Sequence, residues 1–207
     1  MDTELDHLIW GVPDLDDGIR EIERRTGVRA AYGGRHHGVG THNAVLGLGG
    51  RTYLEILAPD PNQTRFSSFG ALVRDLREPK LLSWALRTTD VRARSEVAQR
   101  EGLRPGVVLS MSRRMASGTT LSWRFMQVEG HDFGPLMPFM IEWRCSEHPS
   151  RQSPTGCELQ TLSIESPDAP KLKNHLAILG MTQEVQAATR ADLRAEISAP
   201  TGSISLN

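Results

Sequence analysis

His7 and Glu55 are the residues of this chain whose types and surroundings are best suited to chemistry. His7 lies in the apolar run DHLIWGV and Glu55 lies in the apolar run TYLEILA. An imidazole and a carboxylate can hold a divalent metal, and both can exchange protons. If the two runs are neighbouring strands, the sequence predicts a metal or proton-transfer site between them.

A β-α-β-β-β unit over residues 5–59 would position these two side chains. Residues 5–12 read as a strand, and a helix follows, with Asp14 as its cap and Gly27 as its stop. Three further strands are expected at residues 28–32, 43–48 and 51–58. Gly33-Gly34 reads as part of a flexible loop, whereas Gly49-Gly50 favours a tight turn between the last two strands.

The same order recurs in a second unit, residues 81–148, so that paired units span residues 5–148. A third, shorter unit is expected over residues 155–207, where it would cover an exposed sheet edge or contact a second copy of the chain. The predicted fold is therefore α+β, with tandem β-α-β-β-β modules that form a curved, cup-like mixed sheet.

With the repeat laid out, the chain resembles the vicinal-oxygen-chelate superfamily, which includes glyoxalases, bleomycin-resistance proteins and dioxygenases. Within it, the chain is similar to the glyoxalase-like proteins of bacteria. The likeness rests on four segments: HLIWGVPDL from His7, GTHN from Gly40, YLEILA from Tyr53, and PFMIEW from Pro138 with His148-Pro149 after it.

The resemblance implies metal ligands on the first and last strand of each module. Carried over to this chain, these positions are His7, Glu55, Ser83 (or Leu82) and Glu142. One histidine and two glutamates would suit Zn²⁺, Mn²⁺, Ni²⁺ or Fe²⁺. The predicted function is then an isomerase, lyase or dioxygenase acting on a carbonyl or vicinal-oxygen compound. Because Ser83 is a weak ligand, the alternative is a cup that binds a small or drug-like molecule without metal.

Other residues are candidates for contact with a substrate. His42 could act as an acid, base or hydrogen-bond donor beside the catalytic Glu55, and Asn43, Trp84 and His131 could line the same opening. Each has a plainer alternative: His42 and His131 could be solvated loop residues, and the tryptophans could be core. We expect His36 and His37 to be solvated. The run Ser112-Arg113-Arg114 could meet an acidic ligand, although a solvated loop is the expectation.

Composition narrows the partners and the compartment. The 207 residues carry 24 basic and 25 acidic side chains without a basic block, so we expect no nucleic-acid or membrane partner. Cys145 and Cys157 form no disulfide framework, and no secretory signal is apparent. We therefore expect a cytoplasmic protein that binds a small molecule, with a homodimer as a further expectation.

Overall fold

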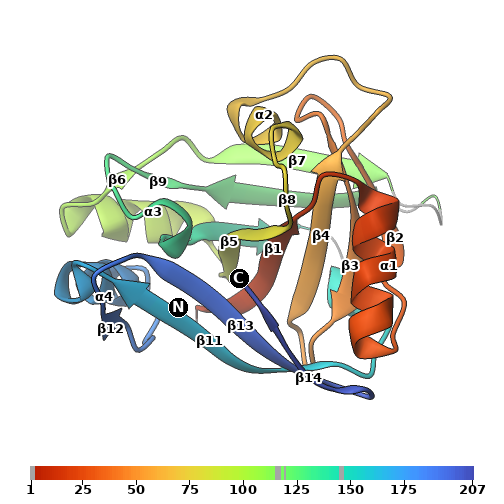
Figure 1. Ribbon diagram of the computed structural model, residues 1–207. Coiled ribbons are helices and arrows are strands. Elements are labelled where there is room, and N and C mark those ends of the chain that lie inside the picture. Colours follow the sequence, from red (N-terminus) through yellow and green to blue (C-terminus); the bar gives the residue numbers. More distant parts are fainter. Residues whose placement is uncertain (1–2, 115–117, 119, 145–146) are drawn as a thin grey trace.

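The computed structural model describes residues 3–114, 118, 120–144 and 147–207, and its centre is a curved eight-stranded sheet (Figure 1). The strand order is β2-β3-β4-β1-β5-β10-β8-β7. The edge strands β2 and β7 also contact each other, so the sheet nearly closes on itself. The strands are β1 (Glu4–Gly11), β2 (Ala31–His36), β3 (Thr41–Gly47), β4 (Tyr53–Pro59), β5 (Lys80–Arg87), β7 (Leu109–Arg114), β8 (Thr120–Met126) and β10 (Phe139–Trp143).

The sheet consists of two halves with one topology, which confirms the predicted fold class. Strands β1 to β4 with α1 (Leu15–Thr26) form the first half, and β5, β7, β8 and β10 with α3 (Val91–Arg100) form the second. The halves join through antiparallel β1 and β5. As predicted, Asp14 caps α1 by accepting from the Asp17 amide, and Gly27 ends the helix at a φ of 74°.

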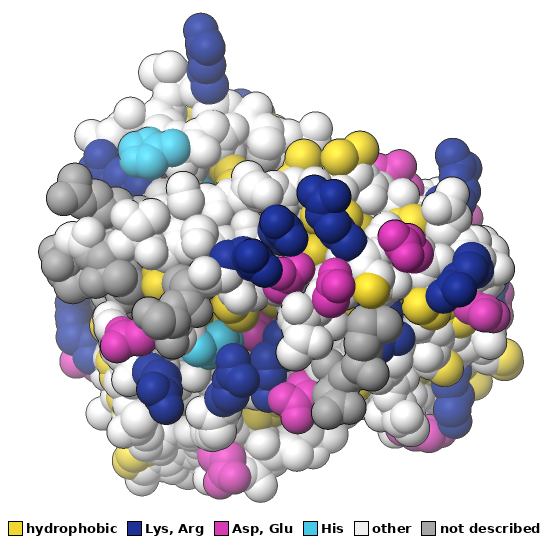
Figure 2. Space-filling model, turned by 180° about the vertical axis from the view of Figure 1, so that it is seen from behind, with side chains coloured by type: hydrophobic (Ala, Val, Ile, Leu, Met, Phe, Trp, Pro, Cys, Tyr) yellow, Lys and Arg dark blue, Asp and Glu magenta, His cyan; other side chains and the backbone are white. Residues whose placement is uncertain are grey.

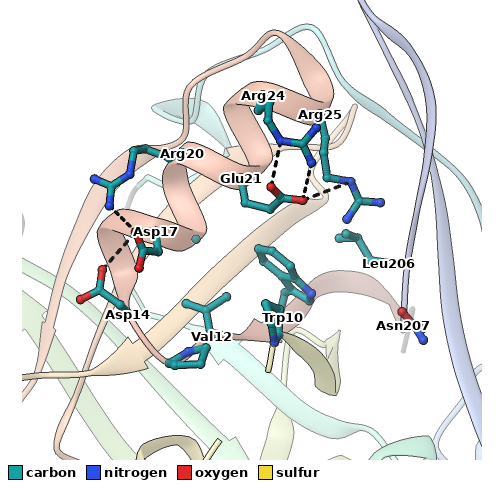
Figure 3. Close-up of a pocket in the computed structure, with 13 residues that line it drawn as sticks. Trp10, Val12, Asp14, Asp17, Arg20, Glu21, Arg24, Arg25, Leu206 and Asn207 are labelled. Carbon is teal, nitrogen blue, oxygen red and sulfur yellow. Dashed lines mark hydrogen bonds and ion pairs between the residues drawn. The ribbon is translucent and has the colours of Figure 1, made fainter. Parts of the chain in front are cut away.

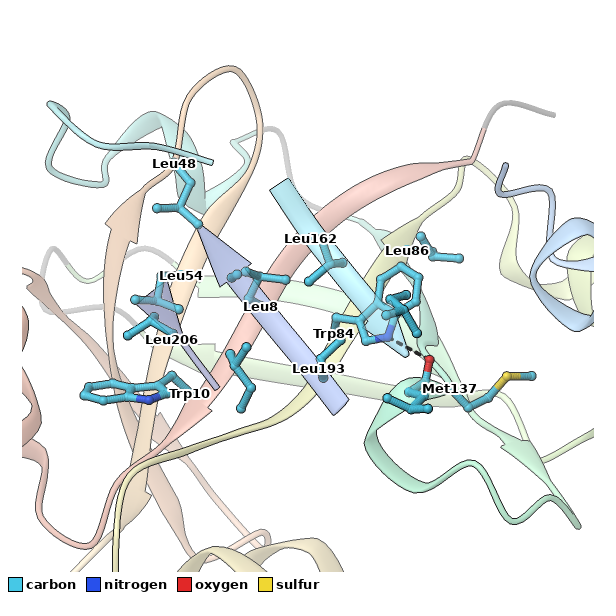
Figure 4. Close-up of a cluster of buried hydrophobic side chains, with 14 of the residues drawn as sticks. Leu8, Trp10, Leu48, Leu54, Trp84, Leu86, Met137, Leu162, Leu193 and Leu206 are labelled. Carbon is cyan, nitrogen blue, oxygen red and sulfur yellow. Dashed lines mark hydrogen bonds between the residues drawn. The ribbon is translucent and has the colours of Figure 1, made fainter. Parts of the chain in front are cut away.

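Helices and a second sheet cover the convex face of the large sheet. α1 and α3 each lie against their own half, and a four-stranded sheet with α4 (Ala169–Ile178) packs across the centre (Figure 1). The strands of this sheet, in their order, are β12 (Gln186–Ala187), β11 (Glu158–Ser166), β13 (Asp192–Ala199) and β14 (Gly202–Leu206). Leu8, Trp10 and Trp84 meet Leu162 and Leu206 in this core (Figure 4). The C-terminal sheet thus covers a face of the large sheet rather than one of its edges, and contact with a second copy of the chain stays a prediction.

The opposite, concave face is hereafter called the cup. Side chains of the two halves meet inside it: Arg113 of β7 donates to Asn43 of β3, and the His36 ring lies edge-on to Trp123 of β8. One end of the cup is filled by α2 (Ser68–Arg74), which adds Val73 to the apolar residues there. The short elements that remain are β6 (Arg104–Pro105), β9 (Val128–Glu129), η1 (Gly134–Leu136) and η2 (Pro149–Arg151).

The glycine pair Gly33-Gly34 was predicted as a loop, and that prediction is wrong. Both glycines lie within β2, which begins at Ala31 and runs to His36 with an irregular register between Tyr32 and Gly34. A glycine in a strand often marks an irregularity or a close approach by another group, and Gly33 has both. The longer strand carries His36 into the cup.

Charge on the outer surface is mixed. Basic and acidic side chains alternate over the face shown in Figure 2, in line with the nearly balanced totals of the sequence. Within the described residues, no helix combines the length and the apolar character needed to span a membrane.

Cys157 is a buried free thiol, and burial raises its pKa. Cys145, the other cysteine of the sequence, lies outside the described residues.

Candidate functional site

Five polar side chains converge inside the cup, and we call them the cup cluster: His7, His36, Asn43, Glu55 and Arg113. The carboxylate of Glu55 is at the centre. Its Oε2 lies 3.7 Å from Nε2 of His7, and its Oε1 lies 3.7 Å from Nε2 of His36. Asn43 Nδ2 donates to the same Oε1, and Arg113 Nη1 donates to Asn43 Oδ1. A carboxylate between two imidazoles is an arrangement suited to proton transfer.

The side chain of His7 is held from behind by Asp6. An irregular register of β1 between Leu5 and His7 lets the neighbouring side chains bond, with Asp6 Oδ1 2.6 Å from His7 Nδ1. The Asp6 carboxylate is fully buried and also bonds His148 Nε2 at 2.9 Å and Trp143 Nε1. Burial raises the pKa of Asp6, but the hydrogen bonds from His148 and His7 outweigh it and hold the pKa well below its usual range. With Nδ1 donating to ionised Asp6, His7 directs its other nitrogen into the cup.

His36 is neutral at physiological pH. Burial lowers its pKa to about 4, with Glu55 opposing the shift and the positive charge of Arg113 adding to it. Nδ1 of His36 lies 3.1 Å from the Thr41 hydroxyl, which leaves Nε2 toward Glu55. A neutral imidazole can donate one hydrogen bond to a ligand oxygen without adding charge to the site.

A family model described as a glyoxalase-like domain matches residues 5–180 of the sequence. The chain belongs to the glyoxalase-like domain family. Its fold is that of the vicinal-oxygen-chelate proteins, as the resemblance predicted. No curated protein matches the chain.

Solved structures share this glyoxalase-like fold at low sequence identity. A hypothetical protein from Staphylococcus aureus has a TM-score of 0.70 at 19% identity, over 98% of this chain and 84% of that one. Methylmalonyl-CoA epimerase from Mycobacterium tuberculosis has a TM-score of 0.51 at 24% identity, over 67% and 86%. The Streptomyces coelicolor epimerase with 2-nitronate-propionyl-CoA has a TM-score of 0.53 at 20% identity, over 70% and 100%. These likenesses concern the fold.

Strand register identifies the counterparts of His7 and Glu55 in the second half of this glyoxalase-like domain. In the antiparallel pair of β1 and β5, His7 lies opposite Ala85 and Ile9 lies opposite Ser83. A half-turn that exchanges the two strands about the pair between them therefore places His7 on Ser83 and Ile9 on Ala85. Ile9 aligns with Glu55, and Ala85 aligns with Phe139. The second half therefore offers a hydroxyl and a phenyl ring where the first offers an imidazole and a carboxylate.

Glu142, predicted as a metal ligand, does not join His7 and Glu55. It lies three residues beyond Phe139, and strand alternation directs it to the convex face, under α3. There its Oε2 accepts from the Val91 amide at 3.1 Å and its Oε1 accepts from Arg144 at 2.8 Å. The Glu142 carboxylate thus accepts a hydrogen bond from the first turn of α3, outside the cup.

The donors of the cup do not fit the metal site expected of the superfamily. Across residues 3–114, 118, 120–144 and 147–207, no group of three or more His, Cys, Asp or Glu side chains is arranged to hold a metal ion. The superfamily draws its ligands from both halves, but His7, His36 and Glu55 all belong to the first half of this chain. At the equivalent positions of the second half, Ser83 and Phe139 do not complete the set.

His42 was the predicted acid or base, but it lies on the other side of the sheet from the cup cluster. Asn43 and His42 are neighbours on β3, so they project to opposite faces. The His42 ring is edge-on to Tyr32, and the charges that affect its pKa include Asp14 and Asp16 near the start of α1. Of this pair, the structure places only Asn43 in the cup.

Trp84 and His131 are also distant from the cup. Trp84 is fully buried in the convex core, and its Nε1 donates to the carbonyl of Leu136 at 3.0 Å (Figure 4). His131 accepts from the Phe133 amide and lies near the Phe133 ring, which in turn meets His175 of α4. Both residues contribute to packing.

Sequence reasoning assigned no site role to Asp6 or His148, expected His36 to be solvated, and favoured a solvated loop over ligand contact for Arg113. The signal for His36 was present but was hidden by the interpretation of Gly33-Gly34 as a loop. Had β2 been extended to residue 36, its pairing with β3 would have placed His36 opposite Thr41, on the face of Asn43. The role of Asp6 depends on the irregularity in β1, and Arg113 and His148 approach the cup only in the folded chain.

A pocket of about 580 Å³ lies elsewhere, between α1 and the C-terminal end (Figure 3). Its lining includes Trp10 and Leu206, and its charged side chains pair with one another, as Arg24 does with Glu21. It is on the convex side and is separate from the cup cluster.

Proposed function

We propose that this protein is a metal-independent enzyme of the isomerase or lyase type that moves a proton at a carbon beside a carbonyl group. The observation that carries the proposal is the buried Glu55 carboxylate, 7% exposed, between the Nε2 atoms of His7 and His36. The neighbours named methylmalonyl-CoA epimerase support an isomerase, because an epimerase inverts the configuration at one carbon.

In this mechanism Glu55 is the general base. Its carboxylate takes the proton from carbon, and the electron pair of the broken C–H bond moves onto the carbonyl oxygen as an enolate. His36, neutral and with its Nδ1 near the Thr41 hydroxyl, donates from Nε2 to that oxygen. The enolate then collapses and carbon recovers a proton, either from Glu55 or from another donor in the cup.

His7 is the second group able to carry a proton in the cup. Its Nε2 is the nitrogen facing Glu55, and its Nδ1 is held by ionised Asp6. A carboxylate behind an imidazole fixes the ring and stabilises its protonated form. When the proton reaches the other face of carbon, His7 with both nitrogens protonated gives it from Nε2. The proton on Glu55 then passes to Nε2 of His7, which restores both groups.

The test is deuterium exchange at carbon, followed by NMR in heavy water with a panel of small 2-oxo acids, aldehydes and thioesters. The wild-type chain should exchange at least one of these faster than buffer does, with and without a chelator. Glu55→Gln should slow that exchange by about 10²- to 10⁴-fold. Exchange that persists in Glu55→Gln, or that a chelator abolishes, would contradict the mechanism.

Binding without turnover is the second candidate, and one observation favours it. The positions equivalent to His7 and Glu55 in the second half are Ser83 and Phe139, so acid–base groups line only part of the cup. A binding protein would show saturable ligand binding with no exchange above the buffer rate for any compound that binds.

A further inference from the structure

Arg113 is a buried cation in an unusual setting. The sequence suggested a solvated loop, but Arg113 lies on β7 with its side chain inside the cup and only 4% exposed. Its Nη1 donates to Asn43 Oδ1. Among the described residues, no carboxylate oxygen comes within 4.0 Å of its guanidinium nitrogens, and Asn43 is its one hydrogen-bond partner.

The fold makes room for this side chain. A methyl group built on Gly33 would collide with both Arg113 Nη1 and Asn43 Oδ1. The glycine is therefore needed where the guanidinium of one edge strand inserts against the backbone of the other. Glycine weakens the interior of a strand. An arginine with its side chain in solvent would not need a glycine opposite it.

The charge of Arg113 is poorly compensated by the protein alone. A guanidinium has five N–H donors, and a buried cation without an anionic partner is strongly unfavourable. Among the described residues, only Nη1 of Arg113 has a hydrogen-bond partner, and Nε and Nη2 have none. These N–H donors of Arg113 therefore remain for a ligand oxygen to accept.

Asn43 holds this cation beside the proposed base. Its amide nitrogen donates to Glu55 and its oxygen accepts from Arg113, so one side chain spans the two. A ligand that places an anionic oxygen on Arg113 would have its neighbouring carbon near Glu55. We propose, on the basis of the proton-transfer function above, that Arg113 binds the carboxylate of the substrate and that the reacting carbon is next to it.

The rest of the cup indicates what the carboxylate is attached to. Opposite the cup cluster lies the apolar half of the cup, defined by Leu121, Trp123, Phe125, Phe139 and Ile141. Phe139 also meets the His7 ring edge-on, with ring centres 5.5 Å apart. Apolar and aromatic surfaces of this kind bind the hydrocarbon part of a ligand. The substrate class is a small carboxylic acid with an apolar or aromatic body.

Matched pairs of carboxylates and amides test this assignment: acetate, phenylacetate and 3-phenylpropanoate against their neutral amides. Binding is measured by tryptophan fluorescence and by thermal stability of the full chain. We expect the aromatic acids to bind at least tenfold more tightly than their amides and than acetate. Equal binding of acid and amide across the panel, or no binding of any acid, would overturn the proposal.

Substitution of Arg113 separates binding from structure. Arg113→Met should lose the preference for acids and, without ligand, be at least as stable as wild type, because a buried charge is removed. Arg113→Lys should keep a weaker preference. Arg124→Met, a strand arginine on the convex side that pairs with Glu142, should bind the acids as wild type does. A destabilised Arg113→Met with the preference intact would make Arg113 a structural residue.

The two proposals fail in different ways. Glu55→Gln should keep the Arg113-dependent preference for acids while losing exchange. Acid binding without exchange in wild type would remove the enzyme proposal and leave the carboxylate site. Exchange on neutral carbonyl compounds that is indifferent to Arg113→Met would do the reverse.

Discussion

The two halves of the large sheet share one topology but line the cup with different chemistry. Strand register pairs the polar positions of the first half with apolar or weakly polar ones of the second. The pairs are His7 with Ser83, His36 with Met111, Asn43 with Phe125, and Glu55 with Phe139. A repeated module thus supplies the same backbone twice, while the side chains of each copy serve a separate purpose.

This difference teaches how a repeated scaffold can gather its polar side chains in one copy rather than share them between both. A metal at the junction of the halves needs ligands from both, and here only the first half provides them. The proton transfer proposed above needs a base and its supporting donors, and the candidates for these roles all lie on β1 to β4. The second half is then free to provide apolar surface, with Arg113 at the closing edge as its one charged contribution to the cup cluster.

The largest expected effect comes from erasing the difference between the halves. Ser83→His combined with Phe139→Glu places an imidazole and a carboxylate at the positions equivalent to His7 and Glu55. We expect this variant to bind about one Zn²⁺ per chain, about 100-fold or more tightly than wild type, by isothermal titration. Ser83→Asn with Phe139→Gln is the matched control. Equally tight binding by wild type would break the comparison.

The next effect concerns the support of the polar half. Asp6→Asn should cost about 3 kcal/mol of unfolding free energy at neutral pH, since it leaves buried donors of His7, His148 and Trp143 poorly matched. The folded pKa of Asp6 is lowered, so its contribution is present above about pH 4 and is lost as pH falls further.

Urea unfolding at a series of pH values checks this prediction. The gap between wild type and Asp6→Asn should narrow as the solution is acidified below the ordinary pKa of an aspartate. Asp17→Asn, a change at an exposed carboxylate, should alter stability by less than about 0.5 kcal/mol. A gap that stays constant with pH would show that the charge of Asp6 is not what stabilises the fold.

His36 gives a smaller effect of the same kind. Because its folded pKa is about 4 against an ordinary 6.5, the unfolded chain binds the proton first, and stability falls as pH drops from 6.5 toward 4. This loss should be roughly 2 to 3 kcal/mol larger in wild type than in His36→Gln. Identical pH profiles of the two proteins would mean that His36 is accessible to protons in the folded state.

The smallest effect is expected on the convex face. His42→Ala should leave exchange at carbon within about twofold of wild type, because the side chain is not in the cup. The same NMR assay used for Glu55→Gln measures it. A loss comparable to that of Glu55→Gln would return His42 to the site and contradict the assignment of faces.

Much of the fold could be predicted because its signals are local. Asp14 and Gly27 mark the ends of α1, and Asp90 caps α3 in the same way. Gly49 and Gly50 both take the positive φ angles that their turn requires. His7, Asn43 and Glu55 could be selected because each lies in or beside a clear apolar strand.

The rest of the site depends on register, which a single sequence does not reveal. A shift by one residue reverses the face of a side chain, and this separates His42 from Asn43 and Glu142 from the cup. The same applies to His36, whose position follows from the length of β2. Arg113 reaches Asn43 only because the two edge strands meet.

The irregularity in β1 also has a consequence for recognising relatives of this protein. In a regular strand the side chains of Asp6 and His7 would point to opposite faces, so their hydrogen bond depends on the extra residue in β1 between Leu5 and His7. An Asp-His pair at the first strand, a glutamate at the fourth, and an apolar residue where Phe139 lies would together mark other chains with the same unequal halves. A histidine alone at the first strand would not distinguish such chains from relatives that carry metal ligands in both halves.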